Sequence, residues 1–159
     1  LQAPINDALA ACGFIGLSLE TRREHLVRAM LESLAFRVYQ IYRTLRKETN
    51  YKFLTVRVDG GVAQNDFLLQ MISTLIDKKL ERSDDIEASC LGACFLAGLG
   101  AGIWHNKNEL KDLCTAKKIF YPEPEKRDEL FAQMKNWERG LDRFTNWYPK
   151  GNTKTRSLS

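Results

Sequence analysis

The sequence predicts an α/β domain, in which strands alternate with helices along the chain. Two observations support this fold class. Long stretches repeat apolar residues every three or four positions, which is typical of amphipathic helices, and short apolar or β-branched runs lie between them. The chain has 159 residues, enough for one domain with a core and too few for two ordinary ones. Its 44% hydrophobic and 28% charged residues are usual for a globular protein.

The first half of the chain begins with an expected loop over residues 1–11, which contains a proline and an Asn-Asp pair. Residues 13–17 form a short apolar run between turn signals and predict a buried strand. A long amphipathic helix is expected over about residues 21–47, opened by a capping box of Thr21 and Glu24. Its apolar stripe consists of Leu26, Met30, Leu34, Val38, Ile41 and Leu45.

Further strands and helices follow at regular intervals. Residues 53–58 are rich in β-branched side chains and predict a strand, and residues 67–76 supply the apolar face of a helix. A short strand is expected at 79–82, and residues 117–121 predict an edge strand that a proline ends. The final helix is expected over residues 124–148. The alternation of strands and helices is the basis of the α/β prediction.

Residues 86–104 are unusual because no charge occurs between Ala88 and Trp104. A membrane span is one interpretation, but 17 residues lie at the lower limit of the spanning range and four glycines dilute the apolar character. Each glycine costs a helix about 1 kcal/mol relative to alanine, so several of them imply close backbone packing. The sequence therefore predicts a buried helix and no membrane span. Cys90 and Cys94 are expected on one face of it as buried free thiols.

The net charge of +4 is concentrated at one end of the chain. Lys150, Lys154 and Arg156 lie in the last ten residues without any acid, so the rest of the chain is close to neutral. A nucleic-acid-binding protein would place its basic residues on a face of the fold, so no nucleic-acid partner is expected. We predict one domain over residues 1–148 and a disordered, basic polar tail over 149–159.

The segment most suited to binding is VDGGVAQND, residues 58–66, which leaves a strand and enters a helix. Gly60 and Gly61 allow a sharp turn or a close approach to a ligand, and the helix start offers free N–H groups. Asn65 could cap the helix or reach a bound nucleotide. The competing interpretation is a tight turn with a cap and no ligand. The segment matches neither a Walker loop nor Gly-x-Gly-x-x-Gly, and the histidine and cysteine spacings match no zinc site.

Four stretches in order resemble the FGGY family of carbohydrate kinases, and glycerol kinases most of all. The central one is RVDGGVAQNDFLLQM at residues 57–71. APIND at 3–7 with Gly-Leu at 16–17, HLVRAMLE at 25–32 with Ala-Phe at 35–36, and EASCLGACFLAGLGAGIW at 87–104 complete the pattern. Together they cover nearly the whole chain up to residue 148 and are far more specific than any one of them.

The resemblance implies a ribonuclease-H-like, or actin-like, ATPase fold, of which this chain would be the C-terminal kinase domain without its opening strands. It implies that Gly60 and Gly61 pack against the nucleotide and that Asn65 lies near the adenine. The aspartate that acts as catalytic base, the polyol-binding residues and the contacts to Mg²⁺ are expected outside the chain. No catalytic or metal-binding residue is therefore assigned within it, and the chain alone is expected to be inactive.

For the whole kinase, the resemblance implies transfer of phosphate from ATP, with Mg²⁺, to glycerol, giving glycerol 3-phosphate. A cytoplasmic location is expected, and a homo-oligomer is left open. The alternative is a non-enzymatic actin-like module that closes on a nucleotide and binds other proteins. Asn6 and Ala11 depart from the family pattern in a loop near the cleft, so the identity of the polyol is also left open.

Overall fold

The computed structural model describes residues 1, 3–49, 51–83, 87–113 and 116–149. Two compact units divide the chain: Leu1–Tyr51 with Glu125–Ser159 form the first, and Lys52–Pro124 form the second. The division into a domain at 1–148 and a tail at 149–159 stays a prediction, because nearly all of that tail lies outside the described residues.

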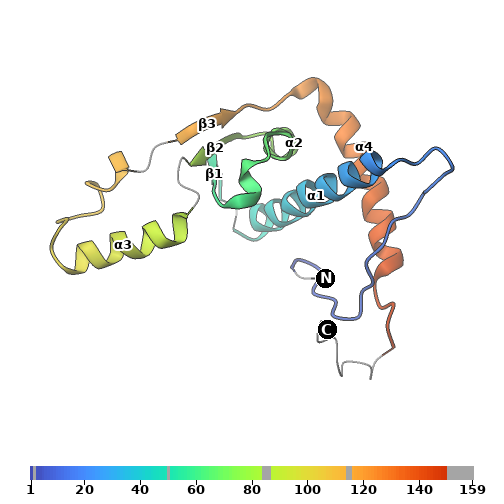
Figure 1. Cartoon of the computed structure of the whole chain (residues 1–159), viewed down its shortest axis with the longest axis horizontal. Helices are drawn as coiled ribbons and strands as arrows, with labels where there is room; N and C mark the ends of the chain where they lie inside the picture. Colours follow the sequence, from blue (N-terminus) through green and yellow to red (C-terminus); the bar gives the residue numbers. More distant parts are fainter. Residues whose placement is uncertain (2, 50, 84–86, 114–115, 150–159) are drawn as a thin grey trace. The chain divides into compact units, whose positions relative to one another are not determined.

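Helices and strands alternate along the chain, as the α/β prediction requires (Figure 1). The elements are α1 (Arg23–Thr49), β1 (Thr55–Val58), η1 (Gly61–Gln64), α2 (Asp66–Ile76), β2 (Lys79–Ser83), α3 (Ala88–Gly100), η2 (Lys111–Leu113), β3 (Ala116–Phe120) and α4 (Pro124–Phe144). Both η elements are single turns of 3₁₀ helix. The predicted helices and the strands at 53–58, 79–82 and 117–121 all occur, with ends shifted by a few residues.

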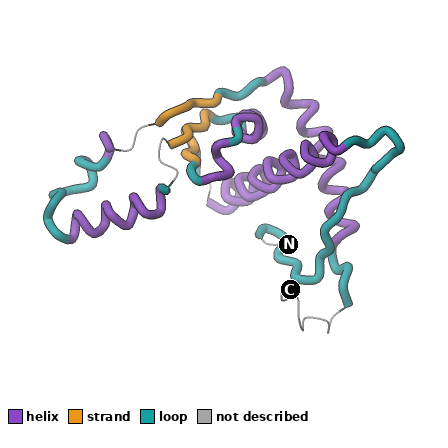
Figure 2. The backbone as a smooth tube through the Cα atoms, in the orientation of Figure 1, coloured by secondary structure: helices purple, strands orange, loops and turns teal. Residues whose placement is uncertain are grey.

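Helices α1 and α4 form the first unit, together with the loop that precedes α1 (Figure 2). Aromatic rings join the two helices: the rings of Phe36 and Trp137 have centroids 5.7 Å apart. The amide of Gln40, which is buried, donates from Nε2 to Oε1 of Glu138 at 3.0 Å. The two helices are therefore held by ring packing with a polar bridge inside it.

The apolar stripe predicted for α1 is not the face that the helix buries. Ala35, Phe36, Gln40 and Tyr42 are buried, whereas the stripe residue Met30 is 50% exposed. The large rings of α1 contact α4 and so decide which face is covered. Periodicity of aliphatic residues alone did not identify that contact.

Two further expectations for this unit are wrong. Residues 13–17 form no strand and the side chains of Phe14 and Ile15 are exposed; the loop is instead held by Ala11, whose N–H donates to the carbonyl of Phe144 at 2.9 Å. The predicted capping box is replaced by other bonds. Thr21 Oγ1 accepts the N–H of Ser18 at 2.8 Å, ahead of the helix start at Arg23.

A three-stranded sheet of order β1-β2-β3 forms the centre of the second unit (Figure 2). Strands β1 and β2 are parallel and are connected through α2, while β3 is antiparallel to β2 and lies at the edge, as predicted. Helix α2 contacts this sheet: the hydroxyl of Ser73 lies 3.1 Å from the carbonyl oxygen of Phe120 at the end of β3. The core of the unit includes Leu68, Leu69, Leu75 and Leu80.

Helix α3 departs from the prediction of a buried helix. Only Gly98 is buried within it, and Cys90 and Cys94 are exposed, so the expectation of buried thiols is wrong here. The predicted close packing occurs at one point: a side chain at Gly98 would collide with the ring of Trp104. The same ring packs against Phe95, with centroids 5.7 Å apart, and the residues of α3 other than Gly98 are half-buried or exposed because one ring cannot cover a helix that is apolar on all sides. Within the described ranges, no helix is long and apolar enough to cross a membrane.

Candidate functional site

The segment singled out in the sequence lies at the carboxyl end of β1. This strand ends at Val58, and the chain passes through Asp59 and Gly60 into η1 and then α2 (Figure 1). In the parallel pairing, Val58 stands opposite Arg82, so the last paired rung of the two strands lies beside this turn. Open α/β sheets bind ligands outside the carboxyl ends of their parallel strands. The turn is therefore placed where this architecture has its binding sites.

Gly60 and Gly61 leave the backbone of the turn uncovered, but only one of them is required by the backbone conformation. Gly60 has φ 89° and ψ 173°, a conformation that is essentially restricted to glycine. Gly61 does not need a positive φ, and a Cβ built on either glycine would meet no atom within 4 Å. Gly60 is thus required by the backbone, whereas the missing side chain of Gly61 leaves open space above the turn.

Asn65 links η1 to α2 and caps the longer helix. Its Oδ1 accepts the N–H of Leu68 at 3.1 Å, and its own N–H donates to the carbonyl of Val62 at 3.2 Å. The cap fixes the direction in which the helix starts and satisfies one of its orphan donors. The cap therefore forms, and it leaves Nδ2 as the group with which Asn65 can donate to a ligand.

The sequence analysis did not identify an ion-pair cluster that adjoins the turn. It consists of Asp66, Arg82 and Lys118, and Asp66 is the first residue of α2. Asp66 Oδ1 lies 2.7 Å from Arg82 Nη1, and Oδ2 lies 2.6 Å from Lys118 Nζ. Hydrogen bonds from Lys118 and then from Arg82 lower the pKa of Asp66 below its ordinary value. The carboxylate thus stays ionised at neutral pH, and the cluster keeps one net positive charge.

Arg82 is the buried member of this cluster. The residue is 8% exposed, and its guanidinium lies over the ring of Phe120, 5.7 Å from the ring centroid. Its Nη1 also donates to the carbonyl of Ala63 in η1 at 3.1 Å. The sequence contained a pattern from which a buried and paired arginine could have been predicted. Strand alternation places Arg82 on the same face as the buried Leu80, and a buried cation requires a carboxylate partner.

In the part of the chain that the structure describes, no three His, Cys, Asp or Glu side chains are grouped as metal ligands. The carboxylate of Asp66 is bound to two cationic side chains. The open backbone and the N–H groups at the helix start suit an organic ligand with an anionic part.

Comparison with known proteins identifies the family. Residues 1–101 match the model of the C-terminal domain of the FGGY family of carbohydrate kinases. The chain belongs to this family, as the sequence motifs predicted. It shares the ribonuclease-H-like, actin-like ATPase fold of the solved FGGY kinases over the part it covers.

Several named relatives are similar to the chain over most of its length. Glycerol kinase 5 of Homo sapiens is 45% identical over 150 residues, which are 94% of this chain and 28% of that protein. Glycerol kinase of Francisella tularensis is 34% identical over 92% of this chain and 29% of its own length. The solved Plasmodium falciparum glycerol kinase with ADP has a TM-score of 0.74 and 32% identity, covering 89% of this chain and 28% of that one. The chain therefore spans less than a third of the length of these relatives.

Proposed function

We propose that this chain is the nucleotide-binding half of an ATP-dependent polyol kinase that phosphorylates glycerol to glycerol 3-phosphate. The observation that carries the proposal is the uncovered Gly60-Gly61 turn at the carboxyl end of β1 in an FGGY C-terminal domain. Similarity to glycerol kinases, one of them solved with ADP, supports both the nucleotide and the polyol.

In this proposal each residue of the turn has its own role. Gly60 and Gly61 let the adenosine part of ATP approach the backbone, and the amide of Asn65 lies near the adenine. Phosphoryl transfer depends mainly on positioning the donor, the acceptor and the charges around the phosphate. The described part of the chain offers positioning of the donor only. Mg²⁺ would accompany ATP, and its contacts, the catalytic base and the polyol site would come from residues outside the chain, which alone is inactive.

The remaining expectations are part of the same proposal. We assign residues 1–148 to the partial C-terminal domain and 149–159 to a basic tail. ATP or ADP and glycerol are the proposed small-molecule partners, the cytoplasm is the proposed location, and a homo-oligomer is compatible with it. Another polyol in place of glycerol would leave the mechanism unchanged.

The test is ADP formation by the full-length protein that contains this chain, with Mg·ATP and a panel of polyols and sugars. A Gly61→Asp variant would place a carboxylate in the open space above the turn. A Gly100→Asp variant on α3 is the matched control, because a side chain there also meets no atom within 4 Å. Turnover of glycerol by the wild type and the control, and its loss in Gly61→Asp, is the expected result.

Other outcomes separate the alternatives. Nucleotide binding without turnover on any substrate would favour a nucleotide-responsive module that binds other proteins. Equal turnover by Gly61→Asp and the wild type would contradict the assignment of the turn. Absence of any nucleotide binding by the wild type would contradict both functions.

A further inference from the structure

The ion-pair cluster joins the turn to the sheet at a defined point. Arg82 belongs to β2, and its guanidinium donates through Nη1 to Ala63 in η1 and to Asp66 at the start of α2. The distances are 3.1 Å to the carbonyl oxygen of Ala63 and 2.7 Å to Oδ1 of Asp66. One buried side chain thus fixes the end of the 3₁₀ turn and the first turn of the helix to the same strand.

The turn needs such an attachment because its glycines do not restrict the backbone. Adjacent glycines sample many conformations, so a Gly-Gly turn keeps one geometry only if its two ends are held. The upstream end is held at Val58 by the pairing of β1 with β2. The downstream end is held by Arg82, whose partner in the same register is Val58. Both ends are therefore fixed to one rung of the sheet.

The chemistry of the anchor fits a guanidinium better than an ammonium group. A planar guanidinium presents several donors in a fixed geometry and stacks on aromatic rings, whereas a lysine amine is a flexible point charge. Arg82 uses this geometry: it lies over the ring of Phe120 while it binds a carbonyl and a carboxylate. Among the described residues, its buried Nε has no hydrogen-bond partner, so the bonds of the guanidinium run through Nη1 to the turn and to Asp66.

We propose that Arg82 is a positioning residue for the nucleotide, which it does not touch: through Ala63 and Asp66 it holds the Gly60-Gly61 turn in the geometry that binds ATP. This inference rests on the proposed function and extends it to a residue of β2. Removal of the guanidinium releases the downstream end of the turn. Nucleotide affinity then falls while the polyol site, which lies elsewhere, keeps its affinity.

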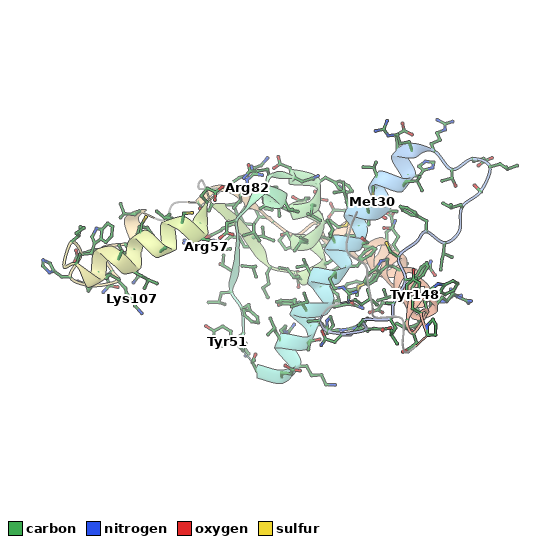
Figure 3. The ribbon with its side chains drawn as sticks, turned by 60° about the horizontal axis from the view of Figure 1, so that its bottom comes forward. Met30, Tyr51, Arg57, Arg82, Lys107 and Tyr148 are labelled. Atoms are coloured by element: carbon green, nitrogen blue, oxygen red, sulfur yellow. The ribbon has the colours of Figure 1, made fainter. Side chains whose placement is uncertain are left out.

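The test compares Arg82→Met with Arg57→Met in the full-length protein. Arg57 is the matched control because it also forms an ion pair in this sheet, with Glu81 at 3.1 Å, but its side chain is 63% exposed and the pair does not involve the turn (Figure 3). The readouts are the Kd for ADP and the KM values for ATP and for the polyol. We expect Arg82→Met to weaken ADP binding and to raise the KM for ATP by about tenfold or more, while its KM for the polyol stays unchanged. In Arg57→Met we expect the Kd for ADP and both KM values to equal those of the wild type.

A second variant keeps the proposal testable if Arg82→Met does not fold. Asp66→Ala removes the carboxylate from a half-exposed position and leaves Arg82 its bond to Ala63. The same selective loss of nucleotide affinity, smaller in size, is expected. ADP affinity in Arg82→Met or Asp66→Ala within twofold of Arg57→Met would overturn the positioning role and leave the proposed function intact. Absence of ADP binding by the wild type would instead overturn the proposed function itself.

Discussion

The two glycines of the turn predict opposite effects of the same substitution. Gly60→Ala forces a Cβ into a glycine-only conformation, at φ 89°, and should destabilise the domain by about 1–3 kcal/mol. Gly61→Ala meets neither strain nor a neighbouring atom. It should leave the fold as stable as before or stabilise it by about 0.4–1 kcal/mol through the unfolded state. The Cβ at Gly61 nevertheless enters the space assigned to the nucleotide.

Two measurements on the full-length protein separate these effects. Native-state hydrogen exchange at the buried amides of α2 reports the stability of this unit, and titration with ADP reports the Kd. Gly61→Ala should weaken ADP binding by about tenfold, equivalent to ~1.4 kcal/mol, without faster exchange. Gly60→Ala should show faster exchange. Tighter or unchanged ADP binding in a stable Gly61→Ala protein would refute the view that its missing side chain makes room for the nucleotide.

Three other substitutions test the packing and electrostatics. Ser73→Ala removes the buried hydroxyl that contacts carbonyls after α2 and at the end of β3, and should cost about 1–3 kcal/mol by hydrogen exchange in α2. Phe36→Ala removes the ring that packs on Trp137, and should cost about 3–5 kcal/mol in the α1–α4 unit, measured in the same way. The pKa of Asp66 is lowered, so its ion pairs should stabilise the folded domain at neutral pH, and this contribution should be lost as the pH falls below the ordinary value of 3.8. Urea unfolding measured against pH should show this loss of stability in the wild type and not in Asp66→Asn.

Local sequence patterns correctly predicted the elements whose packing partners lie close to them in the sequence. The β-branched run of β1 and the apolar face of α2 both formed as predicted. The Gly60-Gly61 turn was also found at the predicted junction of strand and helix. In these segments the pairing partners lie within about one β-α-β unit of the chain, so the local preferences and the final contacts agree.

Contacts between distant segments could not be read in the same way. The run at 13–17 is apolar enough for a strand, but the preceding loop bonds to the end of α4, more than a hundred residues away. The buried face of α1 is set by Trp137 and Phe131 of α4. The partnership of Arg82 with Asp66 could have been suspected from strand alternation, but Lys118 joins them only through the antiparallel pairing of β3 with β2.

The most direct test of the central claim is photolabelling of the full-length protein with 8-azido-ADP, followed by mass-spectrometric mapping of the modified peptide. If the turn holds the nucleotide, the label should lie within residues 58–68, and excess unmodified ADP should prevent it. Labelling that ADP prevents, but that maps entirely outside this segment, would show that the nucleotide binds elsewhere and would contradict the account.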